Sequence, residues 1–207
     1  MQDKSTKKSN PGGRPARPVR RKLVQTHEIR IIGGQWKRTK LKVADKPGLR
    51  PTPDRVRETL FNWLGQDLSG WRCADVFAGT GVLGFEAASR GATEVVLVEQ
   101  DSTLVLQLKA TQEHLKAHGV QVVRGEGVAA LRHLSPASQN LIFLDPPFDG
   151  GLYEPALAAA ARALAPDGFV YLESPTRWTD ELLAAAGLVV HRHLKAGAVH
   201  AHLLRAA

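Results

Sequence analysis

The chain has 207 residues, 43% of them hydrophobic, which is enough for one domain with a buried core. No apolar run approaches the roughly 18 to 20 residues that span a membrane, no secretory signal is expected, and the single cysteine, Cys73, excludes an internal disulfide and a cysteine-cluster metal site. A cytoplasmic protein without a membrane partner is expected, and its formal net charge of +8 is unevenly distributed.

Positive charge is concentrated near the N-terminus. Residues 1–57 contain 17 Lys and Arg against four Asp and Glu, a net of +13, whereas residues 58–207 contain 11 against 16, a net of −5. Residues 1–26 are predicted to be a disordered basic tail, because they hold too few apolar residues to offset the entropy lost on ordering. Attraction to phosphates makes the basic segment a candidate nucleic-acid-binding surface, and a tail that only aids solubility is the alternative.

Residues 27–48 are predicted to form a small β-hairpin that contacts RNA. Ile29, Ile31 and Ile32 precede the pair Gly33-Gly34, and residues 41–43 alternate between apolar and charged side chains, which is typical of a hairpin with a glycine turn or bulge. One side of this hairpin is expected to be strongly cationic. The residues expected to bind RNA are Arg30, Lys37, Arg38, Lys40 and Lys42, together with Arg55 in the following helix.

Residues 49–207 show the alternation of strands and helices that is typical of a doubly wound α/β domain. Thr52 as N-cap and Pro53 at the first helical position predict a helix that runs to about Leu64 and ends at Gly65. Apolar runs predict strands at 73–77, 94–98, 120–123, 141–144 and 168–172, with helices near 82–90, 101–118, 127–134, 152–165 and 179–186. Two further runs, 188–190 and 198–204, predict an antiparallel hairpin at the edge of a mostly parallel sheet.

A glycine-rich loop follows the first of these strands. Gly79, Gly81 and Gly84 let backbone N–H groups approach a ligand at a helix N-terminus. Their spacing also fits a dinucleotide site, with Glu99 in the place of the ribose-binding acid, so NAD is a rival ligand. Asp75 favours S-adenosylmethionine, because that cofactor carries an ammonium and a sulfonium and dinucleotide sites usually keep this position apolar.

Glu126 follows the third strand, at a place where adenine is commonly bound in such folds. Its carboxylate can accept a hydrogen bond from the adenine amino group. A single acid at a strand end is more often part of the plain surface, but the position of Glu126 after the third strand keeps both interpretations open.

The tetrapeptide Asp145-Pro146-Pro147-Phe148 follows the apolar run 141–144, which is typical of a central buried strand. Ligands of open α/β sheets bind at the carboxyl ends of the strands, so we expect the tetrapeptide to face the same crevice as the glycine loop. An ordinary Asp-Pro-Pro turn is the alternative.

The residue types of the tetrapeptide suit methylation of an amino group on a planar ring. The lone pair of such an amine is delocalised, and hydrogen bonds from its N–H groups to the Asp145 carboxylate and the Pro146 carbonyl would localise it. The two prolines fix where that carbonyl points, and Phe148 offers a face for stacking of an extruded base, worth roughly 1–3 kcal/mol.

The chain resembles the bacterial 16S rRNA guanine-N2 methyltransferases of the RsmD type over roughly residues 28–204. The resemblance is carried by the segments at 30–34 (RIIGG), 49–52 (LRPT), 54–62 (DRVRETLFN), 77–81 (FAGTG) and 145–148 (DPPF). It implies a class I methyltransferase fold with a seven-stranded sheet and S-adenosyl-L-methionine as methyl donor. It also implies that the substrate is one guanine of the 16S rRNA, presented by the small ribosomal subunit or its assembly intermediate. The enzyme is expected to be a monomer.

The resemblance also assigns roles to residues. It implies that Arg50-Pro51-Thr52 closes over the methionine end of the cofactor, that Asp75 and the glycine loop lie beneath it, and that Glu99 binds the ribose hydroxyls. At Glu126 the family more often has Asp or Asn, and the long basic tail is not a general family feature. The expected cofactor-binding residues are Arg50, Pro51, Thr52, Asp75, Phe77, Ala78, Gly79, Thr80, Gly81, Gly84, Glu99, Gln100, Glu126, Gly127 and Asp145.

Three alternatives to this function remain. Methylation of adenine N6 or cytosine N4 uses nearly the same tetrapeptide, but the chain shows no separate target-recognition domain for DNA. A non-catalytic ribosome-assembly factor fits the charge distribution without explaining the intact glycine loop and tetrapeptide. An NAD oxidoreductase lacks an evident acid–base pair for hydride transfer. No metal site is expected, because His191, His193, His200 and His202 alternate along presumed strands at the edge of the sheet.

Overall fold

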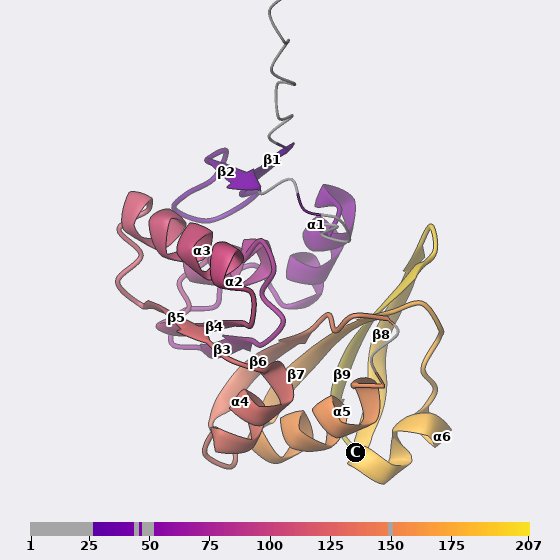
Figure 1. Cartoon of the computed structure of the whole chain (residues 1–207). Helices are drawn as coiled ribbons and strands as arrows, with labels where there is room; N and C mark the ends of the chain where they lie inside the picture. Colours follow the sequence, from indigo (N-terminus) through magenta and orange to yellow (C-terminus); the bar gives the residue numbers. More distant parts are fainter. Residues whose placement is uncertain (1–26, 44–45, 47–51, 149–150) are drawn as a thin grey trace, which may run out of the picture.

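The computed structural model describes residues 27–43, 46, 52–148 and 151–207. Within these ranges a seven-stranded sheet is covered by helices on both faces, and a two-stranded hairpin lies beside the helices of one face (Figure 1). The predicted basic tail, residues 1–26, and two predicted cofactor-binding residues, Arg50 and Pro51, lie outside the described residues.

The large sheet has the strand order β5-β4-β3-β6-β7-β9-β8. The five strands from β5 to β7 are parallel, whereas β9 is antiparallel to both β7 and β8. The strands are β3 (Arg72–Asp75), β4 (Glu94–Glu99), β5 (Val120–Arg124), β6 (Gln139–Leu144), β7 (Leu164–Ser174), β8 (Leu188–Ala196) and β9 (Val199–Ala206). The predicted mostly parallel sheet with an antiparallel edge is confirmed.

The helices lie close to their predicted ranges. They are α1 (Asp54–Trp63), α2 (Val82–Ser89), α3 (Ser102–His114), α4 (Gly127–His133), α5 (Tyr153–Ala163) and α6 (Asp180–Leu183), followed by the 3₁₀ turn η1 (Ala184–Ala186). The helix predicted near 179–186 is therefore split in two. None of the helices described is long and apolar enough to cross a membrane.

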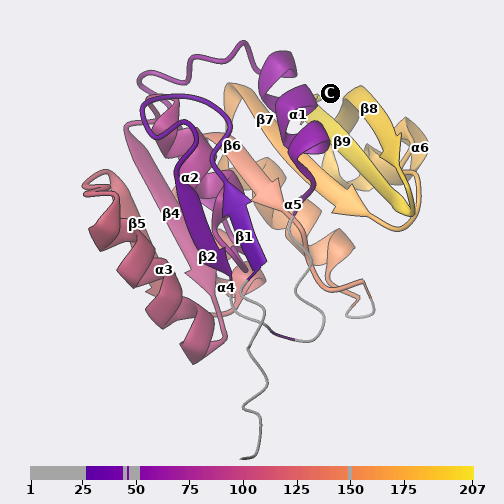
Figure 2. The ribbon, with the colours of Figure 1, turned by 90° about the horizontal axis from the view of Figure 1, so that it is seen from above.

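The sheet separates two apolar layers. Helices α1, α2 and α3 lie on one face with the hairpin, and α4, α5 and α6 lie on the other (Figures 1 and 2). Along β6, Leu141 and Phe143 point into the first layer, while Ile142 and Leu144 point into the second. Because both faces of the strand are buried, its sequence is a continuous apolar run instead of an alternating one.

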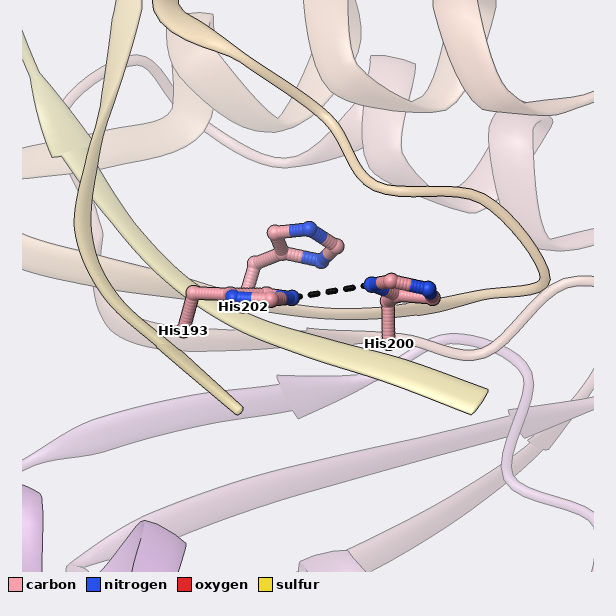
Figure 3. Close-up of side chains that lie close together, drawn as sticks. All are labelled: His193, His200 and His202. Atoms are coloured by element: carbon pink, nitrogen blue, oxygen red, sulfur yellow. Dashed lines mark hydrogen bonds between the residues drawn. The ribbon is translucent and has the colours of Figure 1, made fainter. Parts of the chain in front are cut away.

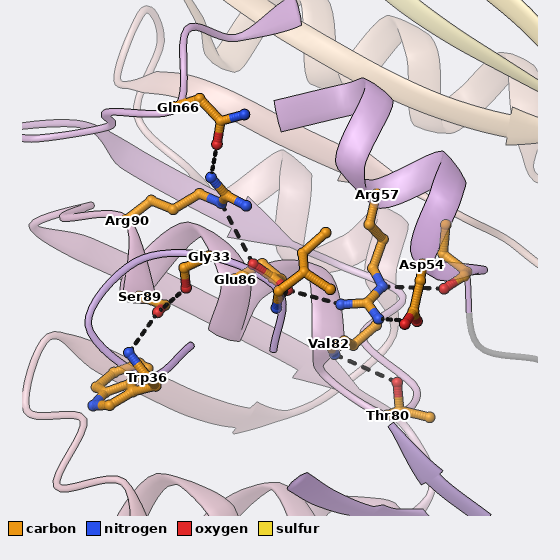
Figure 4. Close-up of polar contacts among 12 residues, drawn as sticks. Gly33, Trp36, Asp54, Arg57, Gln66, Thr80, Val82, Glu86, Ser89 and Arg90 are labelled. Atoms are coloured by element: carbon orange, nitrogen blue, oxygen red, sulfur yellow. Dashed lines mark hydrogen bonds and ion pairs between the residues drawn. The ribbon is translucent and has the colours of Figure 1, made fainter. Parts of the chain in front are cut away.

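The N-terminal hairpin pairs β1 (His27–Arg30) with β2 (Lys40–Val43) in antiparallel register. Ile29, Leu41 and Val43 are buried, whereas Arg30, Lys40 and Lys42 are exposed. The predicted hairpin is confirmed, but its connection spans residues 31–39 and is not a tight glycine turn. The Gly33-Gly34 pair instead packs against the end of helix α2, whose Ser89 hydroxyl donates to the Gly33 carbonyl at 2.6 Å (Figure 4).

Candidate active site

The carboxyl ends of β3 and β6 lie side by side at the centre of the sheet, where Asp75 is in register with Phe143. The chain leaves β3 through α2 toward one edge of the sheet and leaves β6 through α5 toward the other. This reversal is a topological switch point, the place where open α/β sheets bind their ligands. The glycine loop and the Asp-Pro-Pro-Phe tetrapeptide both begin there, as predicted.

The glycine loop joins β3 to helix α2 through backbone conformations that favour glycine. Gly79 has φ +52° and Gly81 has φ +75°, in the left-handed region. A Cβ on Gly81 would also lie 2.4 Å from Cδ2 of Leu108 in helix α3. The first glycines thus allow the turn, and the close packing of α3 prevents larger residues at Gly81.

Asp75 is a buried acid at the end of β3, with 3% of its surface exposed. One of its carboxylate oxygens accepts a hydrogen bond from the Gly84 N–H at 3.2 Å, which ties the strand to helix α2. Burial raises the pKa of this carboxyl to about 7, and the neighbouring charges of Glu99 and Glu173 contribute to the rise.

Glu99 at the end of β4 organises two segments of backbone. Its Oε2 accepts a hydrogen bond from the Gly79 N–H at 2.9 Å, and its Oε1 accepts one from the Asp101 N–H at 2.8 Å. The acid predicted to bind ribose therefore lies against the glycine loop, and its role toward ribose stays a prediction. Gln100, the next residue, is exposed.

Glu126 is the N-cap of helix α4. Its carboxylate accepts hydrogen bonds from the N–H groups of Val128 at 2.9 Å and Ala129 at 2.7 Å. A Cβ on the adjacent Gly127 would lie 2.4 Å from the Val76 carbonyl oxygen, so the chain can pass the glycine loop only with glycine there. Capping accounts for Glu126 structurally, and contact with adenine stays a prediction.

A cavity of about 430 Å³ lies between the sheet and helix α4. Val76, Gly125 and Glu126 line it at the carboxyl ends of the strands, and its other walls are mainly apolar. Such walls suit a flat ring with few polar groups.

Asp145 immediately follows β6 and lies among other acids. Burial raises its pKa well above the ordinary value, and the charges of Glu173 and Asp75 raise it further. Pro146 is buried, whereas Pro147 and Phe148 are exposed, Phe148 by 50%. The tetrapeptide thus presents an acid to the interior and an aromatic ring to the surface.

Glu173 is a site residue that the sequence analysis missed. It lies near the end of β7, is 5% exposed, and accepts hydrogen bonds from the Tyr171 hydroxyl at 2.8 Å and the Thr52 hydroxyl at 2.7 Å. Burial raises its pKa. The signal for it in the sequence is an acid at the carboxyl end of a strand that is otherwise an apolar run.

Thr52 differs in role from the predicted helix N-cap. Pro53 is the N-cap residue of α1, no side chain caps that helix, and the Thr52 hydroxyl donates to Glu173 instead. The Thr52 carbonyl accepts a hydrogen bond from Nε of Arg57 at 3.2 Å. The capping prediction was wrong because a buried acid 121 positions away competes for the hydroxyl.

Two buried donors near these acids have no hydrogen-bond partner in the described part of the chain, the Tyr153 hydroxyl and Nε1 of Trp178. Their rings lie 5.8 Å apart between centroids. Burial raises the pKa of Tyr153, and the charges of Asp145 and Glu173 contribute to the rise, so the hydroxyl lies close to both acids. Unpaired buried donors are costly and are commonly completed by a bound ligand.

Among the residues that the structure describes, the carboxyls of Asp75, Asp145 and Glu173 converge from three neighbouring strands without a balancing cation. In the ranges that the structure covers, no Lys or Arg forms an ion pair with any of them. A ligand that carries positive charge would lower the free energy of the ionised acids. The ammonium and sulfonium of S-adenosylmethionine fit this requirement, whereas the pyrophosphate of NAD does not.

The six predicted RNA-binding residues all have exposed side chains. Arg30, Lys40 and Lys42 lie on the outer side of the hairpin, and Lys37 and Arg38 lie in its connection. Lys40 also pairs with Glu28 at 2.6 Å. The hairpin therefore presents the predicted cationic surface, and its contact with RNA stays a prediction.

Comparisons with known proteins agree with this geometry. The family model described as Conserved hypothetical protein 95 matches residues 29–205 of the chain. Ribosomal RNA small subunit methyltransferase D of Escherichia coli strain K12 is 42% identical over 176 residues, 80% of this chain and 88% of that protein. The protein of the same name from Haemophilus influenzae is 39% identical over 180 residues, 80% of this chain and 92% of that protein.

The fold has counterparts among solved structures. The putative methyltransferase yhhF of Escherichia coli matches with a TM-score of 0.76 and 41% identity, over 87% of this chain and 98% of that chain. The predicted class I methyltransferase fold is thereby confirmed.

Proposed function

The chain belongs to the family described as Conserved hypothetical protein 95, and on that premise we propose that it transfers a methyl group from S-adenosylmethionine to the exocyclic N2 of one guanine in 16S rRNA. The names of the relatives from Escherichia coli and Haemophilus influenzae support ribosomal RNA of the small subunit as the substrate class. The resemblance to guanine-N2 enzymes supports the base. We propose that the protein acts in the cytoplasm, as a monomer, on the small subunit or its assembly intermediate.

The observation that carries the proposal is the position of Asp145 and Pro146 beside the buried acids at the switch point. The Asp145 carboxylate and the Pro146 carbonyl can each accept a hydrogen bond from an exocyclic amino group. These two bonds hold the nitrogen lone pair in one direction, and such alignment is the main source of rate in a transfer between bound groups. Because its pKa is raised, Asp145 can also accept the proton that the nitrogen loses.

Different residues of the candidate active site are assigned to different parts of the cofactor. S-adenosylmethionine, when bound, supplies an electrophilic methyl group on a sulfonium that is a good leaving group. We assign its cationic end to Asp75 and the acid cluster, its ribose to Glu99, and its adenine to the cavity beside Glu126. The Thr52 hydroxyl holds Glu173 in place and so positions the cluster.

Phe148 and the Tyr153–Trp178 pair support binding of an extruded base. The half-exposed Phe148 ring offers a stacking face, worth roughly 1–3 kcal/mol. The Tyr153 hydroxyl and the indole N–H of Trp178 are donors without partners among the described residues, and guanine presents acceptors at O6 and N7.

Replacement of Asp145 tests the mechanism. Asp145→Ala should lower methyl transfer to small subunits at least about a hundredfold, because the amine loses both its hydrogen-bond acceptor and the group that takes up its proton. Calorimetry should show a much smaller loss of cofactor affinity than of methyl transfer, because Asp75 and Glu173 remain to face the cationic end of the cofactor. Asp167→Ala, which removes an exposed acid at the start of β7, is the matched control and should keep full activity. A fully active Asp145→Ala enzyme would exclude the proposed role.

The base itself is tested by mass spectrometry of rRNA nucleosides from cells that lack the protein. The proposal requires loss of one N2-methylguanosine and its return on complementation. Loss of N6-methyladenosine or N4-methylcytidine instead would favour the alternative substrates, and an unchanged rRNA would favour a non-catalytic assembly factor.

A further inference from the structure

Three histidines that are not part of the acid cluster come together at the edge hairpin of the sheet. His193 lies on β8, while His200 and His202 lie on β9 (Figure 3). One ring nitrogen from each of the three residues lies within 4.8 Å of the other two. His202 is buried, and the other two are half-buried. The expectation that these histidines lack metal-ligand pairing rested on sequence alternation alone.

The strand geometry explains why the three side chains share one face. His200 and His202 are two positions apart on β9, so they point to the same side of the sheet. His193 is the direct cross-strand partner of His202. The register shifts between Val190 and Arg192, and without this bulge Arg192 would stand opposite His202 in place of His193.

The contacts of the rings prepare them as ligands. Nε2 of His193 lies 2.9 Å from Nδ1 of His200, in a hydrogen bond. Nδ1 of His202 faces the Leu172 carbonyl oxygen at 3.4 Å, and its Nε2 accepts a hydrogen bond from the backbone N–H of Trp178 at 3.1 Å. A metal-bound imidazole commonly directs its second nitrogen to a carbonyl in this way, so Nε2 of His202 is the nitrogen that an ion would bind, in place of that backbone hydrogen bond.

A charged side chain, Arg177, lies near the rings of His193 and His202. Arg177 is the charged side chain that opposes a bound cation, but its side chain is exposed, so solvent screens its charge.

We propose that His193, His200 and His202 form a binding site for a divalent transition-metal ion, zinc being the representative. Imidazole nitrogens are common zinc ligands at about 2.0–2.1 Å, and two ligands of one tetrahedral ion then lie about 3.3 Å apart. The present separations are 2.9 Å for one pair and at most 4.8 Å, so binding requires side-chain rotations that bring the three nitrogens to this spacing. Three protein ligands leave the fourth position open to water.

A metal ion at this site would change the surroundings of Trp178, which lies next to Tyr153. An ion on Nε2 of His202 replaces the hydrogen bond from the backbone N–H of Trp178, and the Trp178 ring packs on Tyr153. Tyr153 in turn lies close to Asp145 and Glu173. The fluorescence of Trp178 is therefore a readout of binding that does not depend on methyl transfer.

The test is titration of the chelator-treated full chain with Zn²⁺ by calorimetry, and with Co²⁺ by visible spectroscopy. One ion should bind per chain, Co²⁺ should give the intense d–d bands of a tetrahedral or five-coordinate site, and Zn²⁺ should raise the Tm. The double variant His193→Gln/His200→Gln should bind at least about a hundredfold more weakly. These two residues are half-buried, so the variant avoids the buried His202, and its unfolding transition without metal confirms that it is folded.

Two controls make the result specific. His191→Gln removes the neighbouring ring, which packs on Phe169, and His114→Gln/His118→Gln removes an exposed pair from the region of helix α3. Both controls should keep native affinity for Zn²⁺. Binding that survives in His193→Gln/His200→Gln, binding that is lost in either control, or the absence of binding to the native chain would each overturn the proposal.

Discussion

At the scale of single residues, burial gives the acids of this site their chemistry. Asp75, Asp145 and Glu173 are aspartate and glutamate side chains of ordinary kind, yet desolvation raises the pKa of all three. The charge of Glu173 raises the pKa of Asp75 and of Asp145 further, and the charge of Asp75 also raises the pKa of Asp145. These acids therefore favour protons or a cation beside them, and the proposed cofactor supplies the cation.

This linkage predicts the pH dependence of cofactor binding. The pKa of Asp75 is about 7 in the folded chain and near 4 in the unfolded chain, so between these values the folded chain retains a proton and its stability falls as pH rises. A cationic ligand favours the ionised acid and displaces that proton. Affinity for S-adenosylmethionine should rise with pH, by up to about tenfold per unit below pH 7, and level off above it.

Calorimetry in buffers of different ionisation enthalpy measures the protons released on binding. Asp75→Asn should release fewer protons and flatten the pH profile, while Asp167→Asn, at an exposed position, should leave both unchanged. Equal proton release by the native chain and Asp75→Asn would rule out the assigned role of Asp75.

At the scale of elements, the N-terminal hairpin is held by the end of helix α2. The Trp36 N–H donates to the Ser89 hydroxyl at 2.9 Å (Figure 4). The Ile32 N–H donates to Glu86, and the Gln35 N–H donates to the Ser89 carbonyl at 2.7 Å. These bonds give a physical reason for the sequence of residues 30–34. The segment packs against α2, and its two glycines allow the backbone to approach that helix closely.

A buried ion network continues this attachment into helix α1. Nη1 of Arg57 donates to Glu86 at 2.8 Å, and Arg90 lies 3.4 Å from the same carboxylate (Figure 4). Both arginines and Glu86 are almost completely buried. Because Glu86 also accepts the Ile32 N–H, one carboxylate links the hairpin to α1 and α2.

Gly34→Ala should detach the hairpin. The residue has φ +70°, and an added Cβ would lie 1.9 Å from the Ser89 carbonyl oxygen, so we expect a stability loss of about 2–4 kcal/mol from strain and overpacking. Gly187→Ala has a similar φ of +67° in open space and should lose only about 1–2 kcal/mol. Urea denaturation measures both, and equal losses would contradict close packing at Gly34.

The cationic side of the hairpin makes a second prediction at this scale. Combined replacement of Arg30, Lys37 and Lys42 by Ala should weaken RNA binding and reduce the slope of log affinity against log salt by about 2 to 3, since each phosphate contact contributes about 0.7–0.9. Replacement of Lys109, Arg132 and Arg192, which are exposed on other elements, removes the same charge. If both triple variants lose the same slope, the hairpin has no special role.

At the scale of the whole molecule, positive and negative charge are separated along the chain. Residues 58–207 carry a net negative charge, and we propose that the basic segment before them attracts a polyanion. Eight Lys and Arg and one acid lie in residues 1–26 alone.

Removal of residues 1–26 should therefore weaken binding to the small subunit and flatten its salt dependence, while cofactor binding stays unchanged. Filter binding over a range of salt measures this. A full-length variant with the eight cations replaced by Gln separates charge from length. Affinity for the subunit that is unchanged after truncation would make the tail passive.

The sequence alone determined the order and kind of the elements, the edge hairpin, the switch-point position of Asp145 and the glycine loop. It could do so because local patterns encode them: buried parallel strands are continuous apolar runs, and left-handed turns select glycine. Only the tertiary structure brought Glu173 beside Asp75 and Asp145, turned the Thr52 hydroxyl away from helix α1, and placed His193 opposite His202 through a bulge. These features depend on contacts between positions far apart in the chain, on burial and on strand register, and no local spacing in a single sequence records them.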